Sequence, residues 1–150
     1  MFKSFFFLIV ALIAAFTHAG TNEEGLKFLA AKEKEEGVVK LPSGLLYKEI
    51  RPGVGKTPTI SQPTNCHYAG RLIDGTEFDS SYKRGQPLTF APNQVIKGWT
   101  EAMMLMKEGA KWELYIPSEL AYGDRGAGAL IPGGAALIFD IEMLEVLDSK

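Results

Sequence analysis

The sequence predicts an α+β fold in which an antiparallel sheet of five to six strands wraps around one short helix, with another short helix near the N-terminus. Three observations carry this prediction. Apolar and polar residues alternate along 110–116 and again from Leu137, as in strands with one buried face. The Asp74-Gly75 dipeptide is typical of a tight hairpin. One internal segment, 95–106, has apolar residues at helical spacing, so sheet and helix form two layers around one core.

Residues 1–19 have the pattern of a secretory signal peptide. Lys3 precedes an apolar run from Phe5 to Phe16, and a cut is expected between Ala19 and Gly20. An uncleaved anchor is the alternative, but this run is shorter than the ~20 apolar residues that a spanning helix needs. We expect removal of the segment and no stable membrane insertion afterwards. The mature protein then acts in a secretory compartment: a periplasm, the lumen of the endoplasmic reticulum or the outside of the cell.

Residues 20–40 are expected to form an N-terminal helix and a linker. Thr21 and Glu24 have the spacing of a capping box, in which Thr21 is the N-cap. Leu26 and Leu29 give a narrow apolar stripe, and Gly37 is a plausible C-cap. We expect this helix to pack lightly, either on the domain or on a partner.

Residues 41–150 are expected to form one domain. A short strand at 45–50 is followed by loops rich in Pro and Gly and by a strand at 65–72. In the second strand Cys66 and Tyr68 face one side, and His67 and Arg71 face the other. Cys66 is expected to be a buried small hydrophobe, with a reactive or intermolecular thiol as the alternative.

The hairpin strand that returns from Gly75 carries Phe78 and Asp79 and is followed by a polar excursion, 80–86. Strand character resumes at 88–90. In the helix at 95–106, one face is formed by Ile96, Trp99, Met103 and Met106. After the strand at 110–116, a glycine-rich loop carries Tyr122, Leu130 and Ile131 to the last strand. This loop is either the rim of an apolar pocket or an ordinary surface hairpin loop.

Several kinds of site are poorly supported. The net charge is −2 and no basic stripe is present, which argues against nucleic acid as a partner. His67 and Cys66 are adjacent and point in opposite directions, so they do not begin a zinc or iron site, and no cofactor is expected. The parity of His67 turns it away from the apolar side, where a catalytic triad would need it, so a structural histidine is expected. The glycines at 123–128 lack the Lys-Ser/Thr of a phosphate loop.

Several motifs agree in order and spacing with one family. They are His67-Tyr-Ala-Gly, Asp74-Gly-Thr-Glu-Phe-Asp-Ser-Ser81, Val95-Ile-Lys-Gly-Trp99, Ala121-Tyr-Gly123, Ile131-Pro132 and Phe139-Asp-Ile-Glu142. Over 43–147 the chain resembles the FKBP-type peptidyl-prolyl isomerases, and 28–47 is similar to their secreted, macrophage-infectivity-potentiator branch. Those relatives carry a longer N-terminal dimerisation region, and this chain has room for one helix there, so we expect a monomer.

The resemblance implies a pocket for a proline ring. Trp99 would be its floor, with Tyr68, Phe78 and Phe139 as walls, and the Ile96 amide and Tyr122 hydroxyl would bind carbonyl groups. Asp79 and Arg84 would form a polar pair at its edge. The residues implied to be catalytic are Tyr68, Phe78, Asp79, Trp99, Tyr122 and Phe139, and those implied to bind substrate are Arg84, Leu88, Val95, Ile96, Leu130 and Ile131. The chain departs from many relatives at Leu88, Gln94 and Ala127, which bears on specificity and macrolide affinity.

The function implied is cis–trans isomerisation of X–Pro bonds in secreted or lumenal proteins as they fold, without covalent catalysis. The implied partners are proline-containing polypeptides and macrolide inhibitors of the rapamycin type. One alternative is a non-catalytic peptide-binding or chaperone module that uses the same pocket. Another is a domain that its N-terminal helix docks onto a partner, with an incidental pocket.

Overall fold

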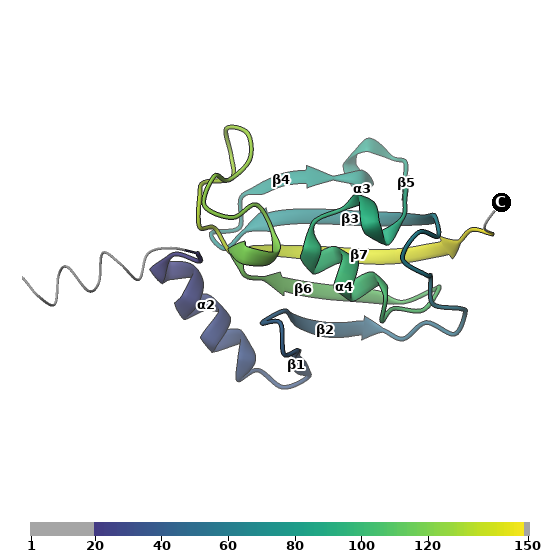
Figure 1. The fold of residues 1–150 in the computed structure, drawn as a ribbon, viewed down its shortest axis with the longest axis horizontal. Coiled ribbons are helices and arrows are strands. Elements are labelled where there is room, and N and C mark those ends of the chain that lie inside the picture. Colours follow the sequence, from purple (N-terminus) through teal and green to yellow (C-terminus); the bar gives the residue numbers. More distant parts are fainter. Residues whose placement is uncertain (1–19, 149–150) are drawn as a thin grey trace, which may run out of the picture.

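The computed structural model describes residues 20–148, so the predicted signal peptide, 1–19, lies outside the described residues. The core of the fold is an antiparallel sheet of seven strands in the order β1-β2-β6-β7-β3-β4, with β5 also paired to β3 (Figure 1). The strands are β1 (Val38–Lys40), β2 (Leu46–Arg51), β3 (Thr64–Leu72), β4 (Glu77–Ser80), β5 (Leu88–Phe90), β6 (Lys111–Ile116) and β7 (Leu137–Val146). The two longest strands, β3 and β7, lie side by side at the centre. The predicted α+β class is confirmed.

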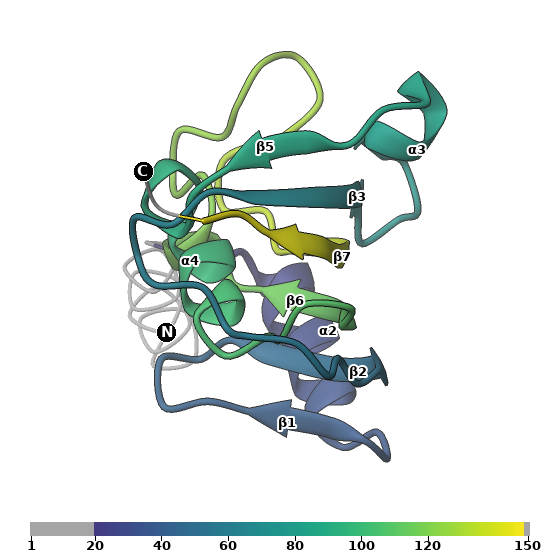
Figure 2. The same cartoon turned by 90° about the vertical axis from the view of Figure 1, so that its right-hand side faces the viewer.

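Among the described residues, three α-helices accompany the sheet: α2 (Glu23–Glu33), α3 (Ser81–Arg84) and α4 (Lys97–Met103). Two short 3₁₀ turns, η1 (Pro92–Gln94) and η2 (Ser118–Leu120), precede and follow the α4–β6 unit. Figure 2 shows α4 against one face of the sheet, while α2 lies across β6 and β2. Within residues 20–148, no helix has the length and apolar character needed to cross a membrane.

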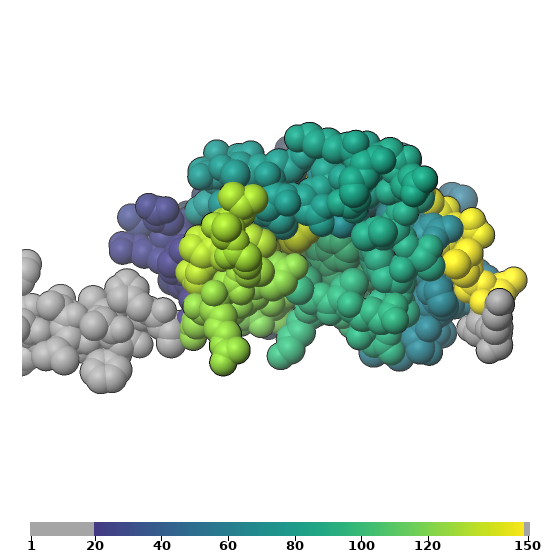
Figure 3. Space-filling model, turned by 90° about the horizontal axis from the view of Figure 1, so that it is seen from above, coloured from purple at the N-terminus to yellow at the C-terminus, as the bar shows by residue number. Residues whose placement is uncertain are grey.

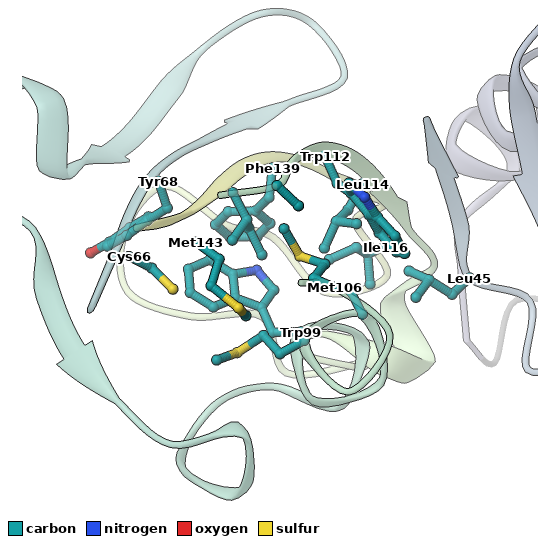
Figure 4. Close-up of a cluster of buried hydrophobic side chains, with 14 of the residues drawn as sticks. Leu45, Cys66, Tyr68, Trp99, Met106, Trp112, Leu114, Ile116, Phe139 and Met143 are labelled. Carbon is teal, nitrogen blue, oxygen red and sulfur yellow. The ribbon is translucent and has the colours of Figure 1, made fainter. Parts of the chain in front are cut away.

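The main core lies between α4 and the sheet. Trp99 and Met103 of α4, and Met106 just after it, belong to one buried cluster with strand residues that include Leu114 and Ile141. Figure 4 shows Trp99, Met106 and Leu114 in this cluster. The alternation predicted for β3 is confirmed, because Cys66 and Tyr68 lie in this core. Cys66 is fully buried, as expected of a small hydrophobe.

A second, smaller cluster lies on the opposite face of the sheet. It consists of Leu46, Tyr115 and Ile138, and α2 covers it with Phe28 and Leu29. The Phe28 and Tyr115 rings meet edge to face at 6.2 Å. The N-terminal helix therefore packs on its own domain through a small contact, in keeping with its narrow apolar stripe.

The predicted cap of this helix is wrong. The N-cap is Asn22, whose side chain accepts a hydrogen bond of 2.8 Å from the Gly25 amide. The Thr21 hydroxyl instead donates to Glu119, far along the chain. The helix ends at Glu33 with Lys34 as its C-cap, so Gly37 is not the C-cap. Asn and Thr are both good N-caps, and the tertiary partner of Thr21 decides between them.

The sheet also differs from the prediction in its details. It has seven strands because a three-residue strand, β1, forms inside the stretch assigned to the linker and pairs with β2. The polar excursion contains the one-turn helix α3, capped by the Ser80 hydroxyl. The internal helix begins only at Lys97, because Val95 and Ile96 are extended. Such short elements contain too few residues to show a period.

Candidate functional site

A cavity of about 880 Å³ opens between α4, the concave face of the sheet and the loop that joins β6 to β7. Figure 3 shows the hollow between the yellow-green loop and the teal and green segments around α3, β5 and α4. Its lining is mostly apolar and aromatic, with few polar side chains. The lining residues are Tyr68, Phe78, Asp79, Leu88, Thr89, Phe90, Gln94, Val95, Ile96, Trp99, Tyr122, Ala127, Gly128, Ala129, Leu130, Ile131 and Phe139.

Trp99 forms the aromatic centre of this cavity. Its ring meets Tyr68 edge to face at 5.0 Å, meets Phe139 edge to face at 5.0 Å and meets Phe90 at 5.4 Å. Phe78 extends the wall by packing on Phe139 at 5.5 Å. Edge-to-face packing fixes ring orientations, so the cavity has a defined apolar shape. Tyr68, Trp99 and Phe139 are seen around one space in Figure 4.

The polar corner of the cavity is a hydrogen-bonded set. The Tyr68 hydroxyl donates to Asp79 Oδ2 at 2.6 Å and accepts from Arg84 Nη2 at 2.9 Å. Arg84 also forms an ion pair with Asp79. Burial disfavours the Asp79 carboxylate, but the hydrogen bonds from Tyr68 and Arg84 outweigh it and lower the pKa of Asp79. Burial and the bond to Asp79 raise the pKa of Tyr68, so the hydroxyl keeps its proton at neutral pH.

The buried hydroxyl of Ser81 holds the backbone of Tyr68 in place. Ser81 Oγ accepts the Tyr68 amide at 2.7 Å and lies 2.8 Å from His67 Nδ1. His67 also stacks on Tyr82, at 4.6 Å between ring centroids. His67 is therefore held on the outer side of the sheet, in agreement with the structural role predicted for it.

The loop between β6 and β7 borders the cavity. Tyr122, Leu130 and Ile131 all line it, and a β-bridge joins Ala127 to Ile131. Burial, together with the charge of Asp79, raises the pKa of Tyr122. Of the two alternatives left by the sequence, the geometry selects a pocket rim.

Eleven of the twelve site residues predicted from the sequence line the cavity, and Arg84 is the exception. Arg84 reaches the site through Asp79 and Tyr68, and its guanidinium lies 5.6 Å from the centre of the Tyr68 ring. Leu88 and Leu130 lie at the rim, where about half of each side chain is exposed. Among residues 20–148, no three His, Cys, Asp or Glu side chains are grouped so as to hold a metal ion.

Phe90 is the main lining residue that the sequence reasoning missed. It lies on a three-residue strand, β5, which is too short to display a buried face. Its position two residues after Leu88 was the available signal, because residues i and i+2 of a strand share a face. Gln94 also lines the cavity, and its side chain accepts the Ala91 amide at 2.9 Å.

Comparison with known proteins identifies the family. Residues 55–144 match the family model described as FKBP-type peptidyl-prolyl cis-trans isomerase, and residues 14–48 match the model of the domain amino terminal to it. The chain is 52% identical over 124 residues to the FKBP-type 22 kDa peptidyl-prolyl cis-trans isomerase of Escherichia coli, which covers 83% of this chain and 60% of that protein. It is 51% identical over 125 residues to the macrophage infectivity potentiator of Trypanosoma cruzi, covering 83% of this chain and 64% of that protein.

A solved structure gives the same result. The peptidyl-prolyl cis-trans isomerase of Pseudomonas syringae superposes with a TM-score of 0.78 at 41% identity, covering 84% of this chain and 92% of that one. The chain spans less than two thirds of the two curated relatives, at 60% and 64% of their lengths. The match of the family model extends over more than half of the chain, from the loop before β3 to near the end of β7. This chain therefore belongs to the family of FKBP-type peptidyl-prolyl isomerases.

Proposed function

We propose that the protein accelerates cis–trans isomerisation of X–Pro peptide bonds and that the cavity around Trp99 binds the proline. The observation that carries this proposal is the arrangement of aromatic rings around Trp99. Its rings enclose an apolar space of defined shape, with one polar corner, in a chain of the isomerase family. An X–Pro bond in an unaided peptide isomerises over tens of seconds, because rotation interrupts amide resonance at a cost of ~20 kcal/mol.

The proposed mechanism needs no covalent step. In the planar ground state, resonance gives the X–Pro amide a large dipole, and the twisted amide is less dipolar. An apolar cavity therefore disfavours the planar form relative to the twisted one. Interactions that are stronger with the twisted amide lower the barrier, which is catalysis by differential binding.

We propose roles for the individual residues, and their positions around the cavity support these roles. We assign Trp99 as the floor beneath the proline ring and Tyr68, Phe78 and Phe139 as the walls. The Tyr122 hydroxyl and the Ile96 amide, which precedes α4, are assigned to bind substrate carbonyls. Asp79 with Arg84 forms the polar edge. The side chains assigned to contact residues beside the proline are Leu88, Val95, Leu130 and Ile131.

A relaxation assay tests the proposal. The cis-to-trans relaxation of a short Leu-Pro peptide is followed with the purified protein, with and without rapamycin, and with Trp99→Leu. The matched control is Leu144→Ala, because Leu144 is an exposed leucine outside the cavity. We expect acceleration that rapamycin and Trp99→Leu abolish and that Leu144→Ala leaves unchanged. A folded protein that binds the peptide without changing its relaxation rate would instead be the non-catalytic module.

We also propose the domain organisation and the compartment. Residues 1–19 act as a signal peptide, 20–40 as a helix and linker, and 41–150 as the isomerase domain, which works on secreted or lumenal proteins. The signal-peptide pattern supports this assignment, as does a relative named outer membrane protein MIP in Legionella longbeachae, 48% identical over 123 residues. Mass spectrometry of the exported protein tests the cut, since an intact mass that retains residues 1–19 contradicts it.

We further propose that the protein acts as a monomer. The apolar side chains Phe28 and Leu29 of α2 pack on the sheet of the same chain, which leaves Leu26 as the large exposed apolar residue of the helix. Sedimentation equilibrium over a range of concentrations is expected to give the mass of one chain. A dimer mass would overturn this proposal.

A further inference from the structure

The first three described residues lie against the base of the loop that borders the cavity. The Asn22 amide donates to the Gly134 carbonyl at 2.8 Å, and the Thr21 hydroxyl accepts the Ser118 amide at 2.9 Å. Thr21 is 3% exposed, although it precedes the N-cap of a surface helix. A buried threonine at this point indicates a specific contact with the loop.

Two carboxylates of the loop point at the same segment. Glu119 accepts the Thr21 amide and the Thr21 hydroxyl, both at 2.8 Å. Asp124 accepts the Gly20 amide at 2.9 Å. Glu119 also comes so close to Gly20 that a Cβ on this glycine would lie 2.2 Å from Oε1. Burial disfavours the Glu119 carboxylate, but hydrogen bonds from its own backbone and from Thr21 prevail and lower its pKa.

These contacts span both ends of the loop. Ser118 and Glu119 precede Tyr122 and Asp124 follows it, while Gly134 follows Ile131 near the end of the loop. Tyr122 and Ile131 both line the cavity. Residues 20–22 thus contact both the beginning of the loop, at Ser118 and Glu119, and its end, at Gly134. The loop residues Tyr122 and Ile131, which line the cavity, lie between these contacts in the sequence.

We propose that residues 20–22 position this loop and that the α-ammonium group released at Gly20 by signal-peptide removal completes the arrangement by pairing with Asp124 and Glu119. Hydrolysis of the Ala19–Gly20 bond by a signal peptidase consumes one water, leaving a carboxylate on Ala19 and an amine on Gly20 that takes up a proton. The amide at Gly20 offers one neutral donor. The ammonium offers three donors and a positive charge to the carboxylates beside it. The inference rests on the proposed function in two respects: it takes the cavity as the substrate site and the bond after Ala19 as the signal-peptidase cut.

The ion pair gives the processed protein a distinctive pH dependence. Asp124 accepts a hydrogen bond from the Gly20 nitrogen, Glu119 lies against the same residue, and Glu23 and Glu24 lie in the first turn of α2. A free α-amino group titrates near 7.7–8.0, and an anionic partner shifts its folded-state value upward. The stabilisation is therefore complete below about pH 7.7 and is lost as pH rises through the raised folded-state value.

The first experiment compares the exported, processed protein with the same protein after its α-amine is acetylated at about pH 6.5, where the more basic lysine side chains stay protonated and the Thr21 amide is untouched. The readout is the chemical shifts of the Gly123 and Gly134 amides between about pH 6 and 10. We expect a titration of both amides in the free protein and none in the blocked protein. Identical pH profiles in the two proteins would overturn the role of the ammonium group.

The second experiment uses matched variants of the same exported protein. Thr21→Val keeps the shape and removes the hydroxyl, whereas Thr21→Ser keeps the hydroxyl. We expect Thr21→Val to lower kcat/KM for the Leu-Pro peptide about fivefold, and Thr21→Ser to restore most of it. Asp124→Asn should abolish the alkaline titration of the Gly123 amide, and Glu23→Gln, on the exposed side of α2, should preserve it.

The amide readout separates this inference from the proposed function. If the processed protein does not isomerise the peptide, the proposed function fails, and the amide shifts still decide whether residues 20–22 hold the loop. Equal kcat/KM and equal Gly134 shifts in Thr21→Val and the parent protein would overturn the positioning role.

Discussion

The Tyr68 hydroxyl donates a hydrogen bond of 2.6 Å to the Asp79 carboxylate, across the hairpin that joins β3 to β4. This contact fixes a ring whose edge lies against Trp99, 5.0 Å away. The same carboxylate also forms an ion pair with Arg84. A polar pair on two adjacent strands therefore sets the orientation of an aromatic wall of the cavity.

Replacing Tyr68 by Phe removes the hydroxyl and keeps the ring. Asp79 then loses one of its two side-chain donors, and the wall loses its tether. Because hydrogen bonds to charged groups contribute about 1.5–3 kcal/mol and this one is partly exposed, we expect kcat/KM for a Leu-Pro peptide to fall about fivefold. Tyr82→Phe is the control, since Tyr82 bonds Glu142 on the outer face. Equal losses in the two variants would contradict a special role for the Tyr68 hydroxyl.

The pKa of Asp79 is predicted to depend on Arg84. Burial raises it, and the hydrogen bonds from Tyr68 and Arg84 lower it by more, so the net shift is downward. The ionised Asp79 carboxylate therefore contributes its full stabilisation above the pKa of about 3.9 that it has in the unfolded chain. This stabilisation is lost as pH falls through its lower pKa in the folded protein. In Arg84→Gln we expect the Asp79 carboxyl to titrate at higher pH in ¹³C NMR. Lys83→Gln is the neighbouring control, because Lys83 pairs with Glu77, and it should leave the titration unchanged.

Gly70 is predicted to be required for the shape of the cavity. A Cβ at this position would lie 2.4 Å from Phe139 Cε1 and 2.7 Å from Phe78 Cε1. Gly70→Ala must therefore displace two walls, at a cost of about 1–3 kcal/mol in stability. Gly75→Ala is a matched contrast, because Gly75 has a positive φ of +93° but open space around it. We expect both variants to lower the melting temperature, but only Gly70→Ala to lower kcat/KM sharply.

Cys66 is predicted to be chemically inert in the folded protein. The side chain is fully buried, and burial raises the pKa of its thiol to about 11. At pH 8 only about one thiol in a thousand would be ionised, and the thiolate is the reactive form. Ellman's reagent should therefore react at least roughly a hundredfold more slowly with the folded protein than after unfolding in urea. Fast reaction in the native state would show that the site opens readily.

The sequence predicted those parts of the fold in which a period is long enough to see. Nine residues of β3 alternate, so the inward direction of Cys66 and Tyr68 followed directly. The aromatic lining residues followed from motif order, because each motif lies on a predicted strand, helix or loop. Phe90 was not predicted to line the cavity because β5 has only three residues. The strand β1 was not predicted for the same reason.

The contacts of Thr21 could not be predicted from the sequence, for a different physical reason. Local spacing makes it an N-cap, and local spacing contains nothing about a carboxylate 98 residues later in the chain. The hydrogen bonds to Glu119 shift the cap by one residue to Asn22. Tertiary contacts of this kind override local propensity, and they need coordinates to be found.

The last prediction concerns Arg71 on the outer face of the sheet. Its two terminal nitrogens lie 3.3 Å from Glu113 and 3.2 Å from Asp140, and all three side chains are less than one third exposed. Burial and the hydrogen bond with Glu113 raise the pKa of Asp140, whereas the bonds that Glu113 receives overcome its own burial and lower the pKa of Glu113. One arginine thus holds two neighbouring carboxyl groups.

Arg71→Met leaves these carboxyl groups without their cation. Their folded-state pKa values then rise above the unfolded values, so the folded variant binds more protons and gains stability as pH falls. We expect the unfolding free energy in urea to drop by about 1–3 kcal/mol at pH 7 and by less near pH 4.5. Arg51→Met is the control, because Arg51 is half exposed and pairs with the single carboxylate of Glu142, and it should cost less than about 1 kcal/mol. An equal loss for Arg71→Met at both pH values would mean that Arg71 acts by packing its aliphatic stem, and not by its charge.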